Sequence, residues 1–263
     1  MTDSLPPIAA PTAARTGRLR RFDLLWLVAI YVAGQGAVVV ASLLLGLVYG
    51  YFFHRAPDLA TFRSGDIAQG AIVAAIVVAA FVFLLGSLWL ARRRGIDRRA
   101  LGFVPTAPRW YLAGAAIFAL FFLFDAAVFH VLDPTGELEN DLTSKLFLAT
   151  GSLGWAIAVA LAAGPLTALA EETLFRGLVY RWFRERWGIA SGIASSGIIF
   201  GLSHFYFVIP GGLAGAVLTG EIMVMGFLTA WLFQASGSLW PPILLHLLNN
   251  SSVVLIAFLA PPG

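Results

Sequence analysis

The chain has 263 residues, of which 59% are hydrophobic and 12% are charged, and its formal net charge at pH 7 is +3. Soluble domains are about a quarter charged, so this composition excludes an ordinary soluble protein. The positive charge is arginine clustered beside apolar runs, which is typical of cytoplasmic membrane flanks and argues against nucleic-acid binding. The chain contains no cysteine, which excludes disulfides and thiolate sites.

In chain order, residues 1–20 predict a disordered cytoplasmic tail, because Met1 to Thr16 is rich in Pro and Ala and lacks helical periodicity. Residues 21–263 predict a single transmembrane helical domain. A bilayer core about 30 Å thick needs roughly 20 apolar residues per helix. The fold class is therefore all-α, a polytopic transmembrane helix bundle of about seven spans. The predicted spans are 24–53, 67–91, 110–132, 154–180, 189–206, 213–233 and 239–259.

The arginines predict the topology. The positive-inside rule places connectors that are rich in arginine in the cytoplasm. The N-terminus is therefore predicted to be cytoplasmic, and we expect an integral protein of a bacterial plasma membrane. The arginines that flank the spans on this side are Arg15, Arg18, Arg20, Arg21, Arg92, Arg93, Arg94, Arg98, Arg99, Arg181, Arg184 and Arg186.

Ionisable residues inside the spans are the default site candidates, because a charge at mid-bilayer costs several kcal/mol. Asp125 and Glu221 match no motif; Glu221 could mark the outer end of a shorter helix, or both could line a cavity. His54 and His130 fall at span ends, where a solvated histidine is ordinary. The candidates are Asp125, Glu171, Glu172, Arg176, His204, Glu221 and His246.

Two adjacent carboxylates stand out in the fourth span. On a helix, Glu172 and Arg176 are about 40° apart and can form an ion pair, whereas Glu171 points about 100° away from Glu172. Glu172 therefore has a partner that makes it tolerable in lipid. Glu171 is left without one in its own helix, as a general base for water requires.

Two later spans each carry a histidine with a residue four positions away on the same face, Phe200 with His204 and His246 with Asn250. Imidazole can bind a metal or stabilise a developing negative charge, and the Asn amide can polarise a carbonyl or orient its histidine. The alternative is polar contact between helices, which such residues commonly make in membranes.

The three motifs, in this order, resemble the CAAX protease and bacteriocin-processing family of intramembrane endopeptidases, which includes the type II CAAX prenyl endopeptidases. Its signature is EExxxR, then FxxxH, then HxxxN or HxxxD, and the resemblance covers roughly residues 154–254. It implies that Glu171 activates the attacking water, that Glu172 and Arg176 support it, and that His204, His246 and Asn250 surround the water and the oxyanion.

Two questions stay open at this stage. Glu171, His204 and His246 could hold a catalytic zinc ion, but a liganded Glu171 could not serve as the base, so metal-free catalysis is an equal alternative. Counting from residue 189 also places His204 about 22 Å deep, which does not match a site towards the cytoplasmic side near Glu171.

The leading hypothesis is an intramembrane endopeptidase that hydrolyses a membrane-associated peptide or protein substrate near the cytoplasmic side of the bilayer. The first alternative is a non-catalytic membrane scaffold or immunity-type protein that retains the polar cluster. A proton-coupled transporter ranks last, because such proteins have repeated halves, and none is visible in the sequence.

Overall fold

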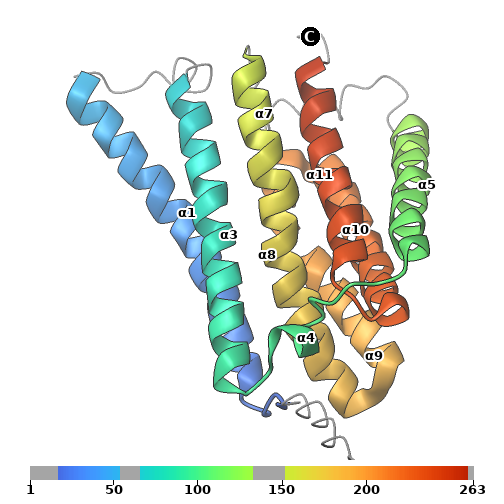
Figure 1. The fold of residues 1–263 in the computed structure, drawn as a ribbon. Coiled ribbons are helices and arrows are strands. Elements are labelled where there is room, and N and C mark those ends of the chain that lie inside the picture. Colours follow the sequence, from blue (N-terminus) through green and yellow to red (C-terminus); the bar gives the residue numbers. More distant parts are fainter. Residues whose placement is uncertain (1–16, 54–65, 133–151, 260–263) are drawn as a thin grey trace, which may run out of the picture.

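The computed structural model describes residues 17–53, 66–132 and 152–259, which are largely helical and contain no strand (Figure 1). The all-α prediction is therefore confirmed. Six stretches of the described chain are long and apolar enough to cross a membrane. They are Asp23–Leu45, Gly70–Arg93, Pro108–Leu132, Leu153–Phe207, Gly211–Ser236 and Trp240–Leu259.

The helices follow the predicted spans closely. They are α1 (Asp23–Phe53), α3 (Asp66–Arg93), α4 (Arg98–Leu101), α5 (Pro108–Leu132), α7 (Leu153–Leu161), α8 (Thr167–Leu174), α9 (Arg181–Leu202), α10 (Val208–Ser236) and α11 (Trp240–Leu259). Short turns of other helical types complete the set: the π-helical η1 (Ala162–Leu166) and η2 (Phe175–Tyr180), and the 3-10 turn η3 (Phe205–Phe207).

The fourth and fifth predicted spans lie in one stretch of 55 residues, Leu153–Phe207, which is why six stretches stand where seven spans were predicted. A straight helix of that length would measure about 80 Å, far more than a bilayer core. Gly188 interrupts α9 with φ 86° and ψ 179°, and the chain turns back there (Figure 1). A positive φ of this kind is favourable for glycine because it has no Cβ. The stretch is therefore two antiparallel legs.

The segments rich in arginine lie together at one end of the bundle (Figure 1, bottom). Asp23, at the start of α1, accepts a hydrogen bond of 2.8 Å from Nε of Arg94, just after α3. This bond raises the pKa of Arg94. Arg181 donates through Nη1 to the carbonyl of Ala100 at 2.9 Å, which ties α9 to α4. The arrangement is the one that the positive-inside rule requires of a single membrane face.

Most of the predicted N-terminal tail, residues 1–16, lies outside the described residues, as do Arg15 and His54. The rest of the segment contacts the helices. Leu19 is 2% exposed within the main core, and the backbone N–H of Gly17 donates to the carbonyl of Gly95 at 3.3 Å.

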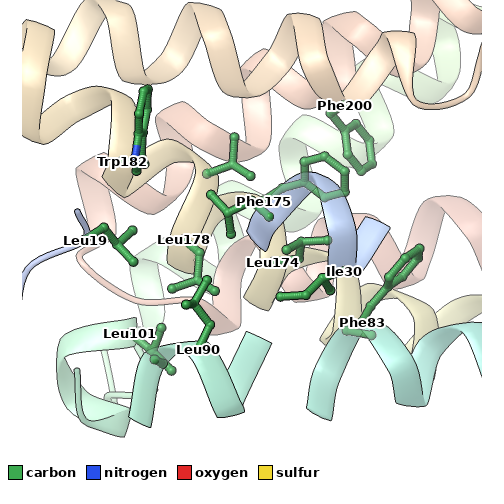
Figure 2. Packing of buried hydrophobic residues seen from close by; sticks show 14 of the residues in the cluster. Leu19, Ile30, Phe83, Leu90, Leu101, Leu174, Phe175, Leu178, Trp182 and Phe200 are labelled. Carbon is green, nitrogen blue, oxygen red and sulfur yellow. The ribbon is translucent and has the colours of Figure 1, made fainter. Parts of the chain in front are cut away.

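The core lies between α1, α3, η2 and the legs of α9, where leucine and aromatic side chains interlock (Figure 2). The outer surface is also apolar: Leu43, Leu47 and Leu123 are more than 60% exposed. Water-soluble monomers rarely expose contiguous apolar surface on this scale, and a lipid bilayer covers it without cost. The chain is an integral membrane protein.

Candidate active site

The predicted ion pair in the fourth span is present and fully buried. Arg176 donates through Nη1 to Oε1 of Glu172 at 2.9 Å, and neither side chain is exposed. An uncompensated charge here would be strongly destabilising, whereas a paired and hydrogen-bonded one is tolerated.

Helix α10 supplies the remaining partners of Arg176. Its Nη2 donates to the carbonyl of Gly226 at 3.0 Å and to the hydroxyl of Thr229. The guanidinium also lies 4.4 Å from the centre of the Phe200 ring. Thr229 was not predicted as a site residue, because nothing in its local sequence distinguishes it from any other polar residue within a span. Arg176 is thus fixed by Glu172, by α10 and by the Phe200 ring.

His246 on α11 lies beside both carboxylates, so Glu172 has a second partner besides the predicted Arg176. Its Nδ1 lies 2.9 Å from Oε1 of Glu172, and its Nε2 lies 3.8 Å from Oε2 of Glu171. An imidazole whose Nδ1–H donates to a carboxylate has a fixed ring orientation and tautomer. Glu172 therefore directs Nε2 of His246 towards Glu171.

Glu171 is 8% exposed, and its Oε2 is buried without a hydrogen-bond partner in the described part of the chain. The 3.8 Å between this oxygen and Nε2 of His246 is too long for a direct hydrogen bond. Two polar atoms at such a separation are suited to sharing a water molecule. Buried carboxylate oxygens without partners are uncommon, and they call for an explanation of this kind.

His204 lies just after the end of α9. Its Nδ1 is 2.8 Å from the carbonyl of Phe200, which leaves Nε2 free for other partners. The Phe200 ring lies 5.0 Å from the ring of His204 and 5.6 Å from that of His246. Phe200 thus lies beside both imidazoles.

The turn at Gly188 removes the mismatch in depth that was predicted for His204. Glu171 is 17 residues before Gly188 (188 − 171) and His204 is 16 residues after it (204 − 188). At 1.5 Å per residue both lie about 25 Å from the turn. The prediction had counted from residue 189 as the membrane boundary; two legs of equal length instead bring the residues level.

Asn250 contacts the backbone of η1 rather than His246. Its Nδ2 donates to the carbonyl of Ala163 at 2.9 Å. The π-helical turn contains Pro165, which has no N–H and frees carbonyls from the helical ladder. A side-chain amide has two N–H groups, so Asn250 can hold η1 and still donate a second hydrogen bond.

Tyr31 and Gln35 on α1 are contacts that the sequence did not reveal. The Tyr31 hydroxyl donates to the carbonyl of Ser203, next to His204, and Gln35 donates to that hydroxyl at 3.0 Å. Neither residue belongs to a motif, and the resemblance to the family begins more than a hundred residues later. Their role as neighbours of the site follows from the packing of α1 alone.

Asp125 on α5 and Glu221 on α10 lie outside this cluster, and their carboxyl groups interact with each other. Glu221 is 4% exposed and lies within α10, so it does not mark a helix end. His130 is exposed in the last turn of α5, as predicted for a span end.

The predicted zinc ligands do not form a complete set as arranged. Both histidines have Nδ1 engaged and Nε2 free, which is how metal-binding imidazoles are usually held. However, among the residues that the structure describes, no three His, Cys, Asp or Glu side chains are grouped so that they could hold a metal ion. The zinc site at Glu171, His204 and His246 therefore stays a prediction.

Comparison with known proteins supports the resemblance seen in the motifs. Residues 153–252 match the family model described as type II CAAX prenyl endopeptidase Rce1-like, in close agreement with the 154–254 boundaries expected from the sequence. The match confirms the family resemblance over the segment from α7 to α11 that carries all three motifs. No curated protein and no solved structure matches the chain.

Proposed function

We propose that the chain, whose protease-like segment matches the Rce1-like endopeptidases, hydrolyses a peptide bond of a membrane-associated substrate within the bilayer. The first substrate class to test is the CAAX type, which the family's description names. The observation that carries the proposal is the separation of 3.8 Å between Glu171 and His246, with a buried carboxylate oxygen facing it. We further propose a bacterial plasma membrane location with the site towards the cytoplasmic side.

The first step is proton removal from water. Oε2 of Glu171 accepts one proton from a water held against Nε2 of His246, and the resulting hydroxide adds to the substrate carbonyl carbon. Glu171 suits this role because Nη1 and Nη2 of Arg176 are engaged by Glu172 and by α10, and no ion pair joins Arg176 to Glu171 within the described residues. General-base catalysis of this kind contributes about 100- to 10,000-fold in rate.

The second requirement is stabilisation of the oxyanion that forms on the carbonyl oxygen. The second N–H of the Asn250 amide is the proposed donor, since the first is fixed on the carbonyl of Ala163. His204 can add a second hydrogen bond through Nε2 only as the imidazolium, because its Nδ1–H already faces the carbonyl of Phe200. Donors that are already positioned need no reorganisation during the reaction. The C–N bond then breaks, and Glu171 returns its proton to the departing amine, which leaves a carboxylic acid and a free amine.

Replacing Glu171 with Gln tests the proposal, because the amide keeps the shape and cannot accept the proton. We expect cleavage of prenylated CAAX reporter peptides by the purified protein to fall about 100- to 10,000-fold, with an unchanged unfolding temperature. Asp125→Asn is the matched control, since it neutralises an intramembrane carboxyl outside the cluster and should keep activity. Full proteolysis by folded Glu171→Gln would overturn the assignment.

The same assay distinguishes the alternatives. Loss of activity on chelation, restored by zinc, would make Glu171, His204 and His246 metal ligands instead of base and donors. If the wild-type chain cleaves no peptide while His204→Ala and His246→Ala unfold at lower temperature, the cluster serves a non-catalytic membrane scaffold.

A further inference from the structure

A cavity lies at the arginine-rich end of the bundle, away from the carboxylates and histidines described above. It has a volume of about 900 Å³ and lies between the segment before α1 and the first turns of α9. Four arginines and a single glutamate line it, together with two tryptophans. The charged lining residues are Arg18, Arg20, Arg21, Arg186 and Glu185.

The four arginines that line this cavity outnumber its one carboxylate. Glu185 is already shared, with Arg181 at 2.9 Å and Arg18 at 3.5 Å. Within the described ranges, Arg186 donates only to neutral backbone carbonyls, those of Trp182 and of Leu19. A surplus of fixed positive charge in a concave site attracts an anion.

Two arginines are free to bind such an anion. Arg20 and Arg21 are exposed, and no ion pair of either side chain occurs within the described ranges. Arg186 is held rigidly, since its guanidinium lies 4.1 Å over the Trp182 ring. One fixed arginine beside two free ones suits the several oxygens of a phosphate group, which arginine recognises through paired N–H donors.

The surroundings of the cavity are those of a membrane surface. Trp182 and Trp187 line it, and tryptophan is typical of the interface between acyl chains and headgroups. Apolar side chains project beside it: Phe22 is 79% exposed, Leu25 67% and Trp187 60%. A soluble phosphate would make no use of these side chains, whereas the acyl chains of a lipid would cover them.

We infer that this cavity is a binding site for the phosphate of an anionic phospholipid headgroup, with Arg20, Arg21 and Arg186 as its ligands. The lipid would join the segment before α1 to the first turns of α9, and α9 continues from η2, which carries Arg176 of the proposed site. The inference depends on the geometry of the cavity alone and does not require the chain to be a protease.

Binding can be measured by native mass spectrometry on the full chain in an uncharged detergent, titrated with phosphatidylglycerol, phosphatidylcholine or inorganic phosphate. Arg20→Gln with Arg21→Gln should lower the affinity for phosphatidylglycerol about 30-fold, because each arginine near an anionic lipid contributes about 1 kcal/mol and 1.4 kcal/mol corresponds to tenfold. The matched control is Arg98→Gln with Arg99→Gln, which removes the same charge from exposed residues of α4 at the same end.

Selective binding of phosphatidylglycerol that is lost only in the first pair of variants supports the inference. Equal weakening by the α4 pair would show general attraction to a basic surface, and it would overturn a defined site. Equal affinity for phosphatidylcholine would overturn recognition of an anion. Competition by inorganic phosphate at the same concentration would overturn the lipid in favour of a soluble anion. Unfolding temperatures that match the wild type keep each comparison valid.

Discussion

At the scale of single residues, Glu172 connects the two halves of the candidate site. One of its oxygens accepts from Arg176 and from His246, each at 2.9 Å. The i, i+4 rule predicts the first contact because both residues belong to one helix. The contact with His246 joins residues 74 positions apart, so no local rule could predict it.

Replacing Arg176 with Met should destabilise the protein by about 3–5 kcal/mol, because breaking a buried ion pair leaves Glu172 uncompensated. Adding Glu172→Gln to this variant should restore part of the loss, since the double variant has no unpaired charge. The measurement is the unfolding free energy of the four proteins of this double-mutant cycle in detergent. Strict additivity of the two single effects would show that the residues do not depend on each other.

At the scale of elements, close approach of α9 and α10 allows Arg176 to reach its carbonyl partner. A Cβ atom added at Gly226 would lie 2.9 Å from Cα and 3.0 Å from the carbonyl oxygen of Gly197 on α9. Both contacts are with backbone, which cannot yield as a flexible side chain could. Small residues at such crossings are the usual means by which membrane helices approach each other.

Gly226→Ala should therefore force α9 and α10 apart, at a cost of about 1–3 kcal/mol for an overpacked contact. It should also lower proteolytic activity, because the Gly226 carbonyl helps to hold Arg176. Gly220→Ala on the same helix is the matched control, since nothing lies within 4 Å of its added Cβ. Thermal unfolding and peptide cleavage measure the two effects, and equal behaviour of the two variants would contradict the packing argument.

The two π-helical turns are a feature of the elements that the sequence did not predict. The sequence predicts the fourth span as one regular helix, yet η1 and η2 interrupt it on either side of α8, which carries both glutamates. Side chains from other helices donate hydrogen bonds to backbone carbonyls of these turns. Asn250 donates to the carbonyl of Ala163, and Ser196 donates to that of Phe175 at 3.3 Å. Such turns are frequent at functional sites.

At the scale of the whole molecule, α1 is held to the bundle at two levels. Near the candidate site Tyr31 reaches Ser203, and at the arginine-rich end the fully buried Asp23 pairs with Arg94. The family resemblance does not include α1, but these contacts hold α1 against the candidate site.

Asp23→Asn should release the lower end of α1 from α3, with a cost of about 1.5–3 kcal/mol for a hydrogen bond to a charged group. The unfolding temperature of the purified protein measures this loss. Arg92→Gln, an exposed charge on the last turn of α3, should have little effect. An unchanged unfolding temperature for Asp23→Asn would show that the helix pair is held by apolar packing alone.

The sequence by itself determined the fold class, the helix positions and the candidate residues. Apolar length specifies a membrane span, and the pairing of Glu172 with Arg176 follows from the helical repeat. These are local properties of the chain. The order and spacing of the motifs likewise predict the resemblance to the family, because they are written in the sequence.

Only the tertiary structure decided which of these residues meet, since contacts between helices depend on where each chain reversal lies and how closely helices cross. The turn at Gly188 makes Glu171 and His204 level, and α11 brings His246 against both glutamates. The two adjacent carboxylates thereby have different surroundings. Glu172 is bound to Arg176 and His246, while Oε2 of Glu171 lies 3.8 Å from Nε2 of His246.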